Sequence, residues 1–215
     1  MDKGKIYCAI IDYGMGNLFS VENACSHVGL NSRITNDINE IRNASLVILP
    51  GVGAFKNAME SLYKLNLVDE ILKFSVSGKP IIGICLGMQL LLEKSYEFGE
   101  HNGLGLIEGE VVNFESNEKL KVPHIGWNQI TELDNEWDNT YLKGLNSNST
   151  MYFVHSLFCV PSDKSIILSE TKYGENNFCS SLIKNNILGV QFHPEKSAGQ
   201  GLKFYKNIYD FICGN

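Results

Sequence analysis

The chain has 215 residues, a net charge of −6 and a composition that is 44% hydrophobic and 20% charged, which is typical of a globular protein. An acidic chain without clustered Lys and Arg argues against a nucleic-acid-binding surface. No stretch reaches the roughly 18 uninterrupted apolar residues of a membrane-spanning helix, and the first apolar run, residues 6–11, is too short for a signal peptide. We therefore expect a cytoplasmic protein that binds neither nucleic acid nor membrane.

The cysteines are scattered, without a C-x-x-C pair or a His pair at zinc spacing. They are Cys8, Cys25, Cys85, Cys159, Cys179 and Cys213. This spacing predicts no metal site, and we expect no metal and no other cofactor. In a reducing compartment most of these residues should be buried free thiols. Cys85 differs from the others because of the motif around it.

Short apolar runs alternate with helical patterns in the first half of the chain. The predicted elements are a strand at 6–11, a helix from 17 or 20 to about 29, a strand at 45–49, a helix at 54–77 broken near Asn66, a strand at 80–84 and a helix from 86 to about 94. Buried strands separated by helices of this length predict parallel βαβ units. The expected fold class is therefore α/β, with a mostly parallel central sheet flanked by helices.

The middle of the chain has a different character. Short alternating segments and turn-rich stretches between residues 99 and 158 predict antiparallel β structure and no long helix. A strand at 187–192 and a helix from about 199 to 212 then complete the α/β pattern. Because there is no internal repeat and no linker, we predict a single domain, 1–215, with an antiparallel β-rich insertion at about 100–158.

Residues 83–87 have the pattern G-x-C-x-G at the junction of a predicted strand and a predicted helix. This is the sulfur counterpart of a nucleophile elbow, whose tight turn strains the central residue and needs glycine on either side. The helix N-terminus favours the thiolate of Cys85, and the N–H of Leu86 would point at an oxyanion. A cysteine between two glycines can equally be a core residue, so other residues must decide.

The segment 191–195 ends the last apolar strand and contains a candidate base and acid. Alternate residues of an extended chain point the same way, so Glu195 can orient the imidazole of His193 while its other nitrogen faces a thiol. Pro194 favours the extended state for the preceding residue. Taken alone, a histidine at the end of a strand is more often solvated, and a glutamate near a helix start is more often a surface carboxylate. Together with Cys85, the two residues favour a catalytic interpretation. The carboxyl ends of parallel strands share one edge, so Cys85 and His193 can meet there.

A glycine-rich segment at 49–55 also follows a strand. Glycines around Val52 let successive backbone N–H groups turn inward, which would supply a second oxyanion donor beside Leu86. An ordinary strand-to-helix turn explains the same residues equally well. The segment 14–19 is a weak phosphate-binding signal, since Phe19 occupies the place of the third glycine of G-x-G-x-x-G.

Two other classes of protein fit parts of this pattern. A cysteine-type α/β-hydrolase also has G-x-C-x-G, but its acid lies between nucleophile and histidine in chain order, whereas Glu195 follows His193 here. A non-catalytic binding module would tolerate the loss of any of the three residues. All three are present in consistent contexts, so an enzyme is favoured.

Taken together, these motifs resemble the class I glutamine amidotransferases over essentially the whole chain, and among them the glutaminase subunits of imidazole glycerol phosphate synthase. The features that carry the resemblance are the segments 83–89 and 193–195 for the class, and 12–18, 50–55, 123–128, 152–156 and 193–197 for the subunit. The resemblance implies that Cys85 attacks the side-chain amide of L-glutamine and releases ammonia. Water then hydrolyses the thioester while His193 moves protons.

The same resemblance implies roles for further residues. Those that would hold glutamine are Gly51, Gly53, Gln89, Glu97 and Ser156, with the oxyanion amides at Val52 and Leu86. The expected partner is a (β/α)8-barrel cyclase, which would form a heterodimer with this chain and use the ammonia. The residues that would face it are Asn17, Trp127, Tyr152 and Lys196. A shielded path to the barrel is expected because free ammonia would be protonated in water and lose its nucleophilicity.

The sequence departs from the family pattern at one position. Leu157 follows Ser156 where the family usually has an aromatic residue, and Phe158 comes next. If the aromatic ring helps to close the site over glutamine, that contact is altered or shifted by one residue. Related subunits feed ammonia to sugar amidotransferases of surface-polysaccharide synthesis. The catalytic residues do not separate this alternative from histidine biosynthesis.

Overall fold

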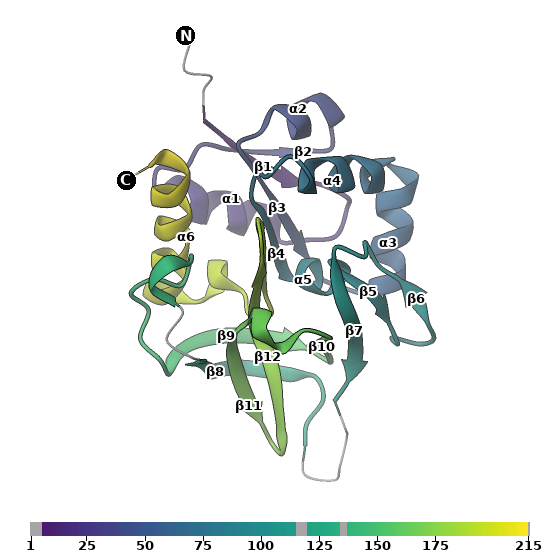
Figure 1. Ribbon diagram of the computed structural model, residues 1–215, viewed down its shortest axis with the longest axis vertical. Coiled ribbons are helices and arrows are strands. Elements are labelled where there is room, and N and C mark those ends of the chain that lie inside the picture. Colours follow the sequence, from purple (N-terminus) through teal and green to yellow (C-terminus); the bar gives the residue numbers. More distant parts are fainter. Residues whose placement is uncertain (1–5, 115–119, 134–136, 215) are drawn as a thin grey trace.

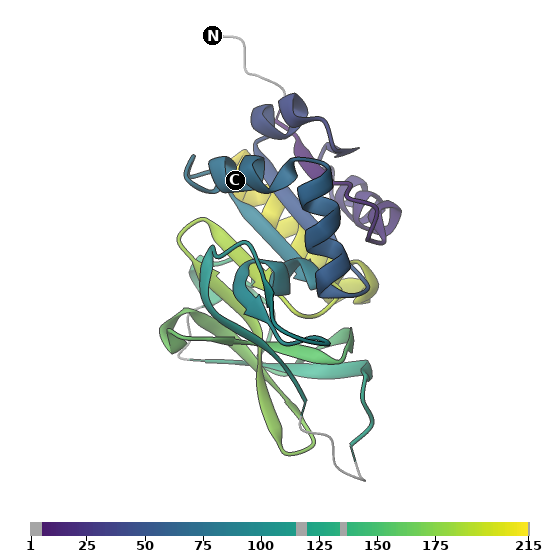
Figure 2. The same ribbon diagram turned by 90° about the vertical axis from the view of Figure 1, so that its right-hand side faces the viewer.

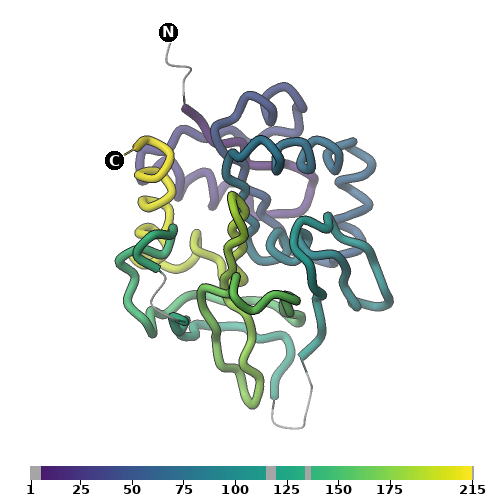
Figure 3. The backbone as a smooth tube through the Cα atoms, in the orientation of Figure 1, coloured from purple at the N-terminus to yellow at the C-terminus, as the bar shows by residue number. Residues whose placement is uncertain are grey.

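The computed structural model describes residues 6–114, 120–133 and 137–214. Its centre is a parallel sheet with the strand order β2-β1-β3-β4-β13 (Figure 1). These strands are β1 (Cys8–Ile11), β2 (Ser32–Thr35), β3 (Leu46–Gly51), β4 (Ile81–Cys85) and β13 (Ile187–Val190). The tube in Figure 3 shows β13 beside β4 although the two are far apart in the sequence. The carboxyl ends of β3, β4 and β13 therefore meet at one edge of the sheet.

Helices cover both faces of this sheet (Figures 1 and 2). They are α1 (Leu18–His27), α2 (Ile38–Asn43), α3 (Phe55–Lys64), α4 (Leu67–Ser75), α5 (Leu86–Leu90) and α6 (Ala198–Cys213). Alternation along β1 divides the core, because Cys8 and Ile10 pack with α1 and α6, whereas Ala9 and Ile11 pack with α3 and α4. The predicted helix at 54–77 is broken as expected, at Asn66, whose φ is 56°. The α/β class predicted from the sequence is confirmed.

The sheet extends beyond β13 through β12, β10, β7, β5 and β6, with β11, β8 and β9 attached to one side, and the pairing there is antiparallel except between β7 and β5. Their bounds are β5 (Leu92–Ser95), β6 (His101–Asn102), β7 (Ile107–Asn113), β8 (His124–Glu132), β9 (Ser149–His155), β10 (Leu157–Pro161), β11 (Ile167–Tyr173) and β12 (Asn176–Lys184). The prediction of an insertion at 100–158 therefore ends too early, because pairing of β11 and β12 continues the antiparallel structure to Lys184. Residues 115–119 and 134–136 of the predicted insertion lie outside the described residues.

The helix predicted from 86 to about 94 is too long. The structure ends α5 at Leu90, and the chain then enters β5, where Leu92 pairs with Ile107 of β7. A run of leucines is compatible with either a buried helix or a buried strand. Pairing with β7 makes the residues from Leu92 onward a strand. The helix behind Cys85 is therefore short, so its dipole contributes less to a thiolate than a full-length helix would.

Two elements were missing from the sequence prediction. The strand β2 pairs with β1, and α2 is capped by Asp37, whose carboxylate accepts hydrogen bonds from the N–H groups of Asn39 and Glu40. The spacing of Asp37 and Glu40 is a helix-start signal that could have revealed α2. The strand β3 also continues to Gly51, which pairs with Cys85, instead of ending at residue 49. No helix in the described part of the chain is long and apolar enough to cross a membrane.

Candidate active site

Cys85 lies at the end of β4, where the chain turns into α5, with φ 54° and ψ −110°. This conformation costs a non-glycine residue on the order of 1–3 kcal/mol, so the surrounding structure must impose it. The flanking glycines permit the turn. A Cβ on Gly87 would lie 1.7 Å from the carbonyl oxygen of Leu49, and one on Gly83 would lie 2.8 Å from the backbone of Gly87. The strained elbow predicted from the sequence is confirmed.

His193 and Glu195 form a buried pair, with 2.8 Å between Nδ1 of the imidazole and Oε1 of the carboxylate. The alternation that predicted this pair is only half right. His193 is extended, but Pro194 begins a 3₁₀ turn, η3 (Pro194–Lys196), that brings Glu195 back to the ring. Proline favours the first position of such a turn because its φ is already fixed. The bond to Nδ1 leaves Nε2, which has no hydrogen-bond partner within the described residues, for another role.

Opposing effects act on the charge of His193. Burial lowers the pKa of this imidazole, but the negative charges of the Cys85 thiolate and the Glu195 carboxylate outweigh it and raise the pKa to about 10. Because the folded pKa lies above the usual 6.5, the stabilisation is complete below pH 6.5 and is lost as the pH rises through about 10. The two acidic groups that face His193 therefore favour its protonated, imidazolium form.

We expect His193 to remain protonated up to about pH 10 in the wild-type protein and to titrate at lower pH in Cys85→Ala. The substitution removes the charge of the thiolate, so only Glu195 then raises the pKa of His193 against the lowering effect of burial. NMR titration of the imidazole signals measures both values. The same His193 titration in the two proteins would contradict charge coupling to Cys85.

His124 provides an internal control for that titration, because burial alone shifts its pKa, whereas the charge of His193 also acts on His155. Both histidines are buried, with 3.1 Å between Nδ1 of His124 and Nε2 of His155. Burial lowers the pKa of His124 to about 4 and that of His155 to about 3, so both rings are neutral at physiological pH. Among the residues that the structure describes, neither imidazole is hydrogen-bonded to an acid, which agrees with the choice of His193 as the candidate base.

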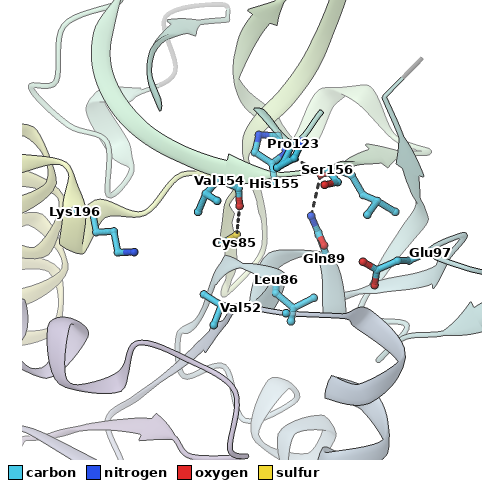
Figure 4. A pocket seen from close by; sticks show the side chains of 12 residues that line it. Val52, Cys85, Leu86, Gln89, Glu97, Pro123, Val154, His155, Ser156 and Lys196 are labelled. Atoms are coloured by element: carbon cyan, nitrogen blue, oxygen red, sulfur yellow. Dashed lines mark hydrogen bonds between the residues drawn. The ribbon is translucent and has the colours of Figure 1, made fainter. Parts of the chain in front are cut away.

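The sulfur of Cys85 faces a cavity of about 420 Å³ at the carboxyl ends of β3 and β4 (Figure 4). The cavity is lined by Val52, Gly53, Cys85, Leu86, Gln89, Glu97, Pro123, Val154, His155, Ser156, Leu157 and Lys196. Of the five residues predicted to hold a substrate, four line the cavity, and the fifth, Gly51, is buried at the end of β3 and is not among the lining residues. A Cβ on Gly51 would lie 2.3 Å from the hydroxyl oxygen of Tyr13 and 2.9 Å from Cβ of Leu86, so the sheet edge is closely packed there.

The two predicted oxyanion positions lie on the same side of the cavity, next to Cys85 (Figure 4). Leu86 is the first residue of α5, so its N–H has no acceptor within the helix. Val52 follows the end of β3, and its neighbour Gly53 has φ 105°, a conformation that glycine adopts without strain. This backbone can place two amides beside Cys85.

Glu97 contacts the loop that carries Val52 as well as the cavity. Its carboxylate accepts a hydrogen bond of 2.5 Å from the N–H of Phe55, the first residue of α3. Ala54 provides no side-chain cap, so Glu97 caps this helix from a distant part of the sequence. A ligand group that binds Glu97 in the cavity would therefore be connected, through the hydrogen bond from Phe55 to Glu97, to the segment next to Val52.

The residues predicted to face a partner form an aromatic and basic cluster beside the cavity. Trp127 of β8 is 55% exposed and pairs with Tyr152 of β9, with 5.9 Å between the ring centroids. The ammonium of Lys196 lies 5.8 Å from the centroid of the Tyr152 ring. Asn17 is half-buried at the start of α1, which packs against η3. Exposed aromatic side chains such as that of Trp127 are enriched at protein interfaces.

Leu157 lines the cavity, whereas Phe158 does not. Adjacent residues of a strand point to opposite faces, and Phe158 packs against Phe114 with 4.9 Å between the ring centroids. The aromatic contact expected from the family is therefore not shifted by one residue. An aliphatic side chain occupies this part of the cavity.

The sequence prediction missed Gln191 as a functional residue. Its side chain is fully buried, and its amide nitrogen lies 3.6 Å from the sulfur of Cys85. A glutamine at the end of an otherwise apolar strand is the signal that could have revealed it, since buried polar groups need specific partners. No group of three or more His, Cys, Asp or Glu side chains that could hold a metal occurs in residues 6–114, 120–133 and 137–214.

Comparison with known proteins assigns the family. The model of the glutamine amidotransferase class-I family matches residues 9–210. The chain belongs to the class I glutamine amidotransferases. This glutamine amidotransferase is 46% identical over 206 residues to "Imidazole glycerol phosphate synthase subunit HisH" of Syntrophotalea carbinolica, covering 94% of this chain and 98% of that protein. The protein of the same name from Aquifex aeolicus is 48% identical, with 93% and 94% covered.

Solved structures of this glutamine amidotransferase fold are more distant in sequence. "Structure of PurLQS from Thermotoga maritima" superposes with a TM-score of 0.73 at 18% identity, covering 97% of this chain and 99% of that one. A "Crystal structure of glutamine amidotransferase" superposes with a TM-score of 0.72 at 15% identity, covering 96% and 99%. The chain is an enzyme of this family, so the hydrolase and binding-module alternatives are set aside.

Proposed function

We propose that the chain is the glutaminase subunit of an imidazole glycerol phosphate synthase, hydrolysing L-glutamine to glutamate and ammonia. The observation that carries the proposal is the combination of Cys85, which has a strained backbone conformation and lines the cavity, with the buried His193–Glu195 pair. The relatives named above, which are nearly half identical over almost their whole length, support this choice of subunit.

In the proposed mechanism, the thiolate of Cys85 attacks the amide carbon of glutamine and forms a tetrahedral oxyanion. The N–H groups of Val52 and Leu86 stabilise the negative charge on its oxygen. The imidazolium of His193 donates a proton to the departing nitrogen. The C–N bond then breaks, ammonia is released, and the acyl group remains bound to Cys85 as a thioester. The neutral imidazole then removes a proton from water, which hydrolyses the thioester to glutamate and restores the pair. Glu195 stabilises the imidazolium and holds its tautomer.

The amino-acid end of glutamine is assigned to Gln89 and Glu97, with backbone contacts at Gly51, Gly53 and Ser156. Glu97 suits the substrate's ammonium because it is a carboxylate at the cavity wall. The cluster of Trp127, Tyr152 and Lys196, together with Asn17, is assigned to a (β/α)8-barrel cyclase. Ammonia would pass directly from the cavity into that barrel. The cytoplasmic location expected from the sequence is part of this proposal.

We expect the isolated chain to hydrolyse glutamine slowly and its barrel partner to accelerate the reaction. The glycines next to Val52 allow its peptide to turn toward or away from Cys85, and docking next to the cavity would fix the productive state. Glutaminase turnover should be measured alone and with each candidate barrel, the histidine-pathway cyclase and a sugar amidotransferase. Full activity without a partner would contradict the coupling. Acceleration by the sugar amidotransferase alone would contradict the choice of pathway.

A further inference from the structure

Gln191 joins the nucleophile to a residue of the substrate cavity. It follows the last residue of β13, Val190, which pairs with Ile84, so it lies beside Cys85 at the sheet edge. Its Nε2 donates a hydrogen bond to Sγ of Cys85 at 3.6 Å, and its Oε1 accepts one from Nε2 of Gln89 at 3.1 Å. The amide makes both contacts with no exposed surface.

The orientation of both amides follows from a backbone carbonyl. Gln89 lies 3.0 Å from the carbonyl oxygen of Leu157, which can only accept a hydrogen bond, so the Gln89 atom facing it must be Nε2. The second N–H of this nitrogen reaches Gln191, which must therefore present its oxygen to Gln89. The remaining end of Gln191, its NH₂ group, then faces the sulfur of Cys85.

These contacts leave one polar atom of the Gln89 side chain available. Both N–H groups of its amide are used, on Leu157 and on Gln191, so Oε1 is the atom that it can offer to the cavity that it lines. An oxygen at this point accepts from an N–H donor of a ligand and repels a carboxylate.

We propose that Gln191 is a positioning residue that donates a hydrogen bond to the Cys85 thiolate and holds the Gln89 amide with its oxygen directed to the substrate. This inference rests on the proposed glutaminase function and adds a residue to that site. A donor facing sulfur stabilises the thiolate relative to the thiol, because hydrogen bonds to charged groups are stronger. A fixed Gln89 oxygen favours binding of a substrate N–H group.

Two substitutions separate these roles. Gln191→Met keeps the length of the side chain and removes both polar contacts, whereas Gln191→Glu keeps an oxygen for Gln89 and places a carboxylate next to the sulfur. In both variants we expect alkylation of Cys85 by iodoacetamide at neutral pH to slow by about tenfold, and its half-maximal pH to rise by about one unit. Peptide mass spectrometry assigns the alkylation to Cys85.

The Michaelis constant separates the second role from the first. Gln191→Met frees the Gln89 amide, so KM for glutamine should rise as well as kcat fall, whereas Gln191→Glu should lower kcat with a smaller effect on KM. Kinetics are measured on the full chain with its activating barrel. Gln200→Met in α6 is the matched control, since Gln200 makes no hydrogen bond to the cavity residues described by the structure, and it should behave as wild type.

Circular dichroism establishes that each variant is folded, and one folded variant is sufficient for the alkylation test. Wild-type alkylation profiles and wild-type KM in the folded variants would overturn the role of Gln191. Unchanged glutamine turnover in Cys85→Ala would instead overturn the proposed function, so the two failures are distinguishable.

Discussion

Cys85→Ala should leave the protein folded and lower glutamine turnover by about 10⁴-fold or more. Alanine has the same Cβ as cysteine, so it accepts the same backbone conformation and changes the packing little. It removes the sulfur that would form the thioester, so His193 and Glu195 no longer have a side-chain nucleophile at position 85 to activate. Glutamate release by the complex of the variant with its barrel partner measures the loss.

The matched control is Cys213→Ala. Cys213 lies at the end of α6, its thiol is half-buried, and it is not one of the residues that line the cavity. This variant should retain wild-type turnover. A chain with alanine at position 85 that still releases glutamate at a substantial rate would show that the nucleophile lies elsewhere.

Gly87→Ala should disrupt both the fold and the site. The added Cβ would lie 1.7 Å from the carbonyl oxygen of Leu49, a backbone atom of β3, so α5 must move away from the sheet. We expect the free energy of unfolding to fall by about 3 kcal/mol or more, because overpacking against backbone cannot be relieved by a side-chain rotation. Movement of α5 also displaces the N–H of Leu86, so turnover should fall even in the folded fraction.

Gly199→Ala supplies the comparison for this substitution, since nothing lies within 4 Å of the added Cβ in the first turn of α6. Its unfolding free energy should stay within about 0.5 kcal/mol of wild type. Denaturant unfolding followed by circular dichroism measures both variants. Equal stability of the two would mean that the elbow tolerates a side chain at position 87.

The parts of the site that the sequence predicts are those with local geometric requirements. Glycines at 83 and 87 indicate the elbow, because a Cβ at 83 would meet the backbone of Gly87 in α5 and a Cβ at 87 would meet the carbonyl oxygen of Leu49 in β3. His193 and Glu195 are close enough in sequence that their contact needs only a short turn. The central strands are likewise evident, because strands buried on both faces are continuous apolar runs.

What the sequence did not predict depends on long-range pairing. The apolar run that ends α5 becomes β5 only because β7 lies beside it, and β12 belongs to the antiparallel part because it pairs with both β11 and β13. The role proposed for Gln191 depends on contacts with Cys85 of β4 and Gln89 of α5, and Gln89 is itself held by the carbonyl of Leu157 in β10. None of these contacts is encoded by residue type or spacing in one segment.

Covalent labelling of the nucleophile tests the central claim most directly. A glutamine analogue with an electrophilic carbon in place of the amide should react once per chain, and intact mass followed by peptide mapping should assign the adduct to Cys85. The account predicts that excess glutamine protects this thiol and that Cys85→Ala stays unlabelled under the same conditions. An adduct on another residue, or equal labelling of Cys85→Ala, would contradict it.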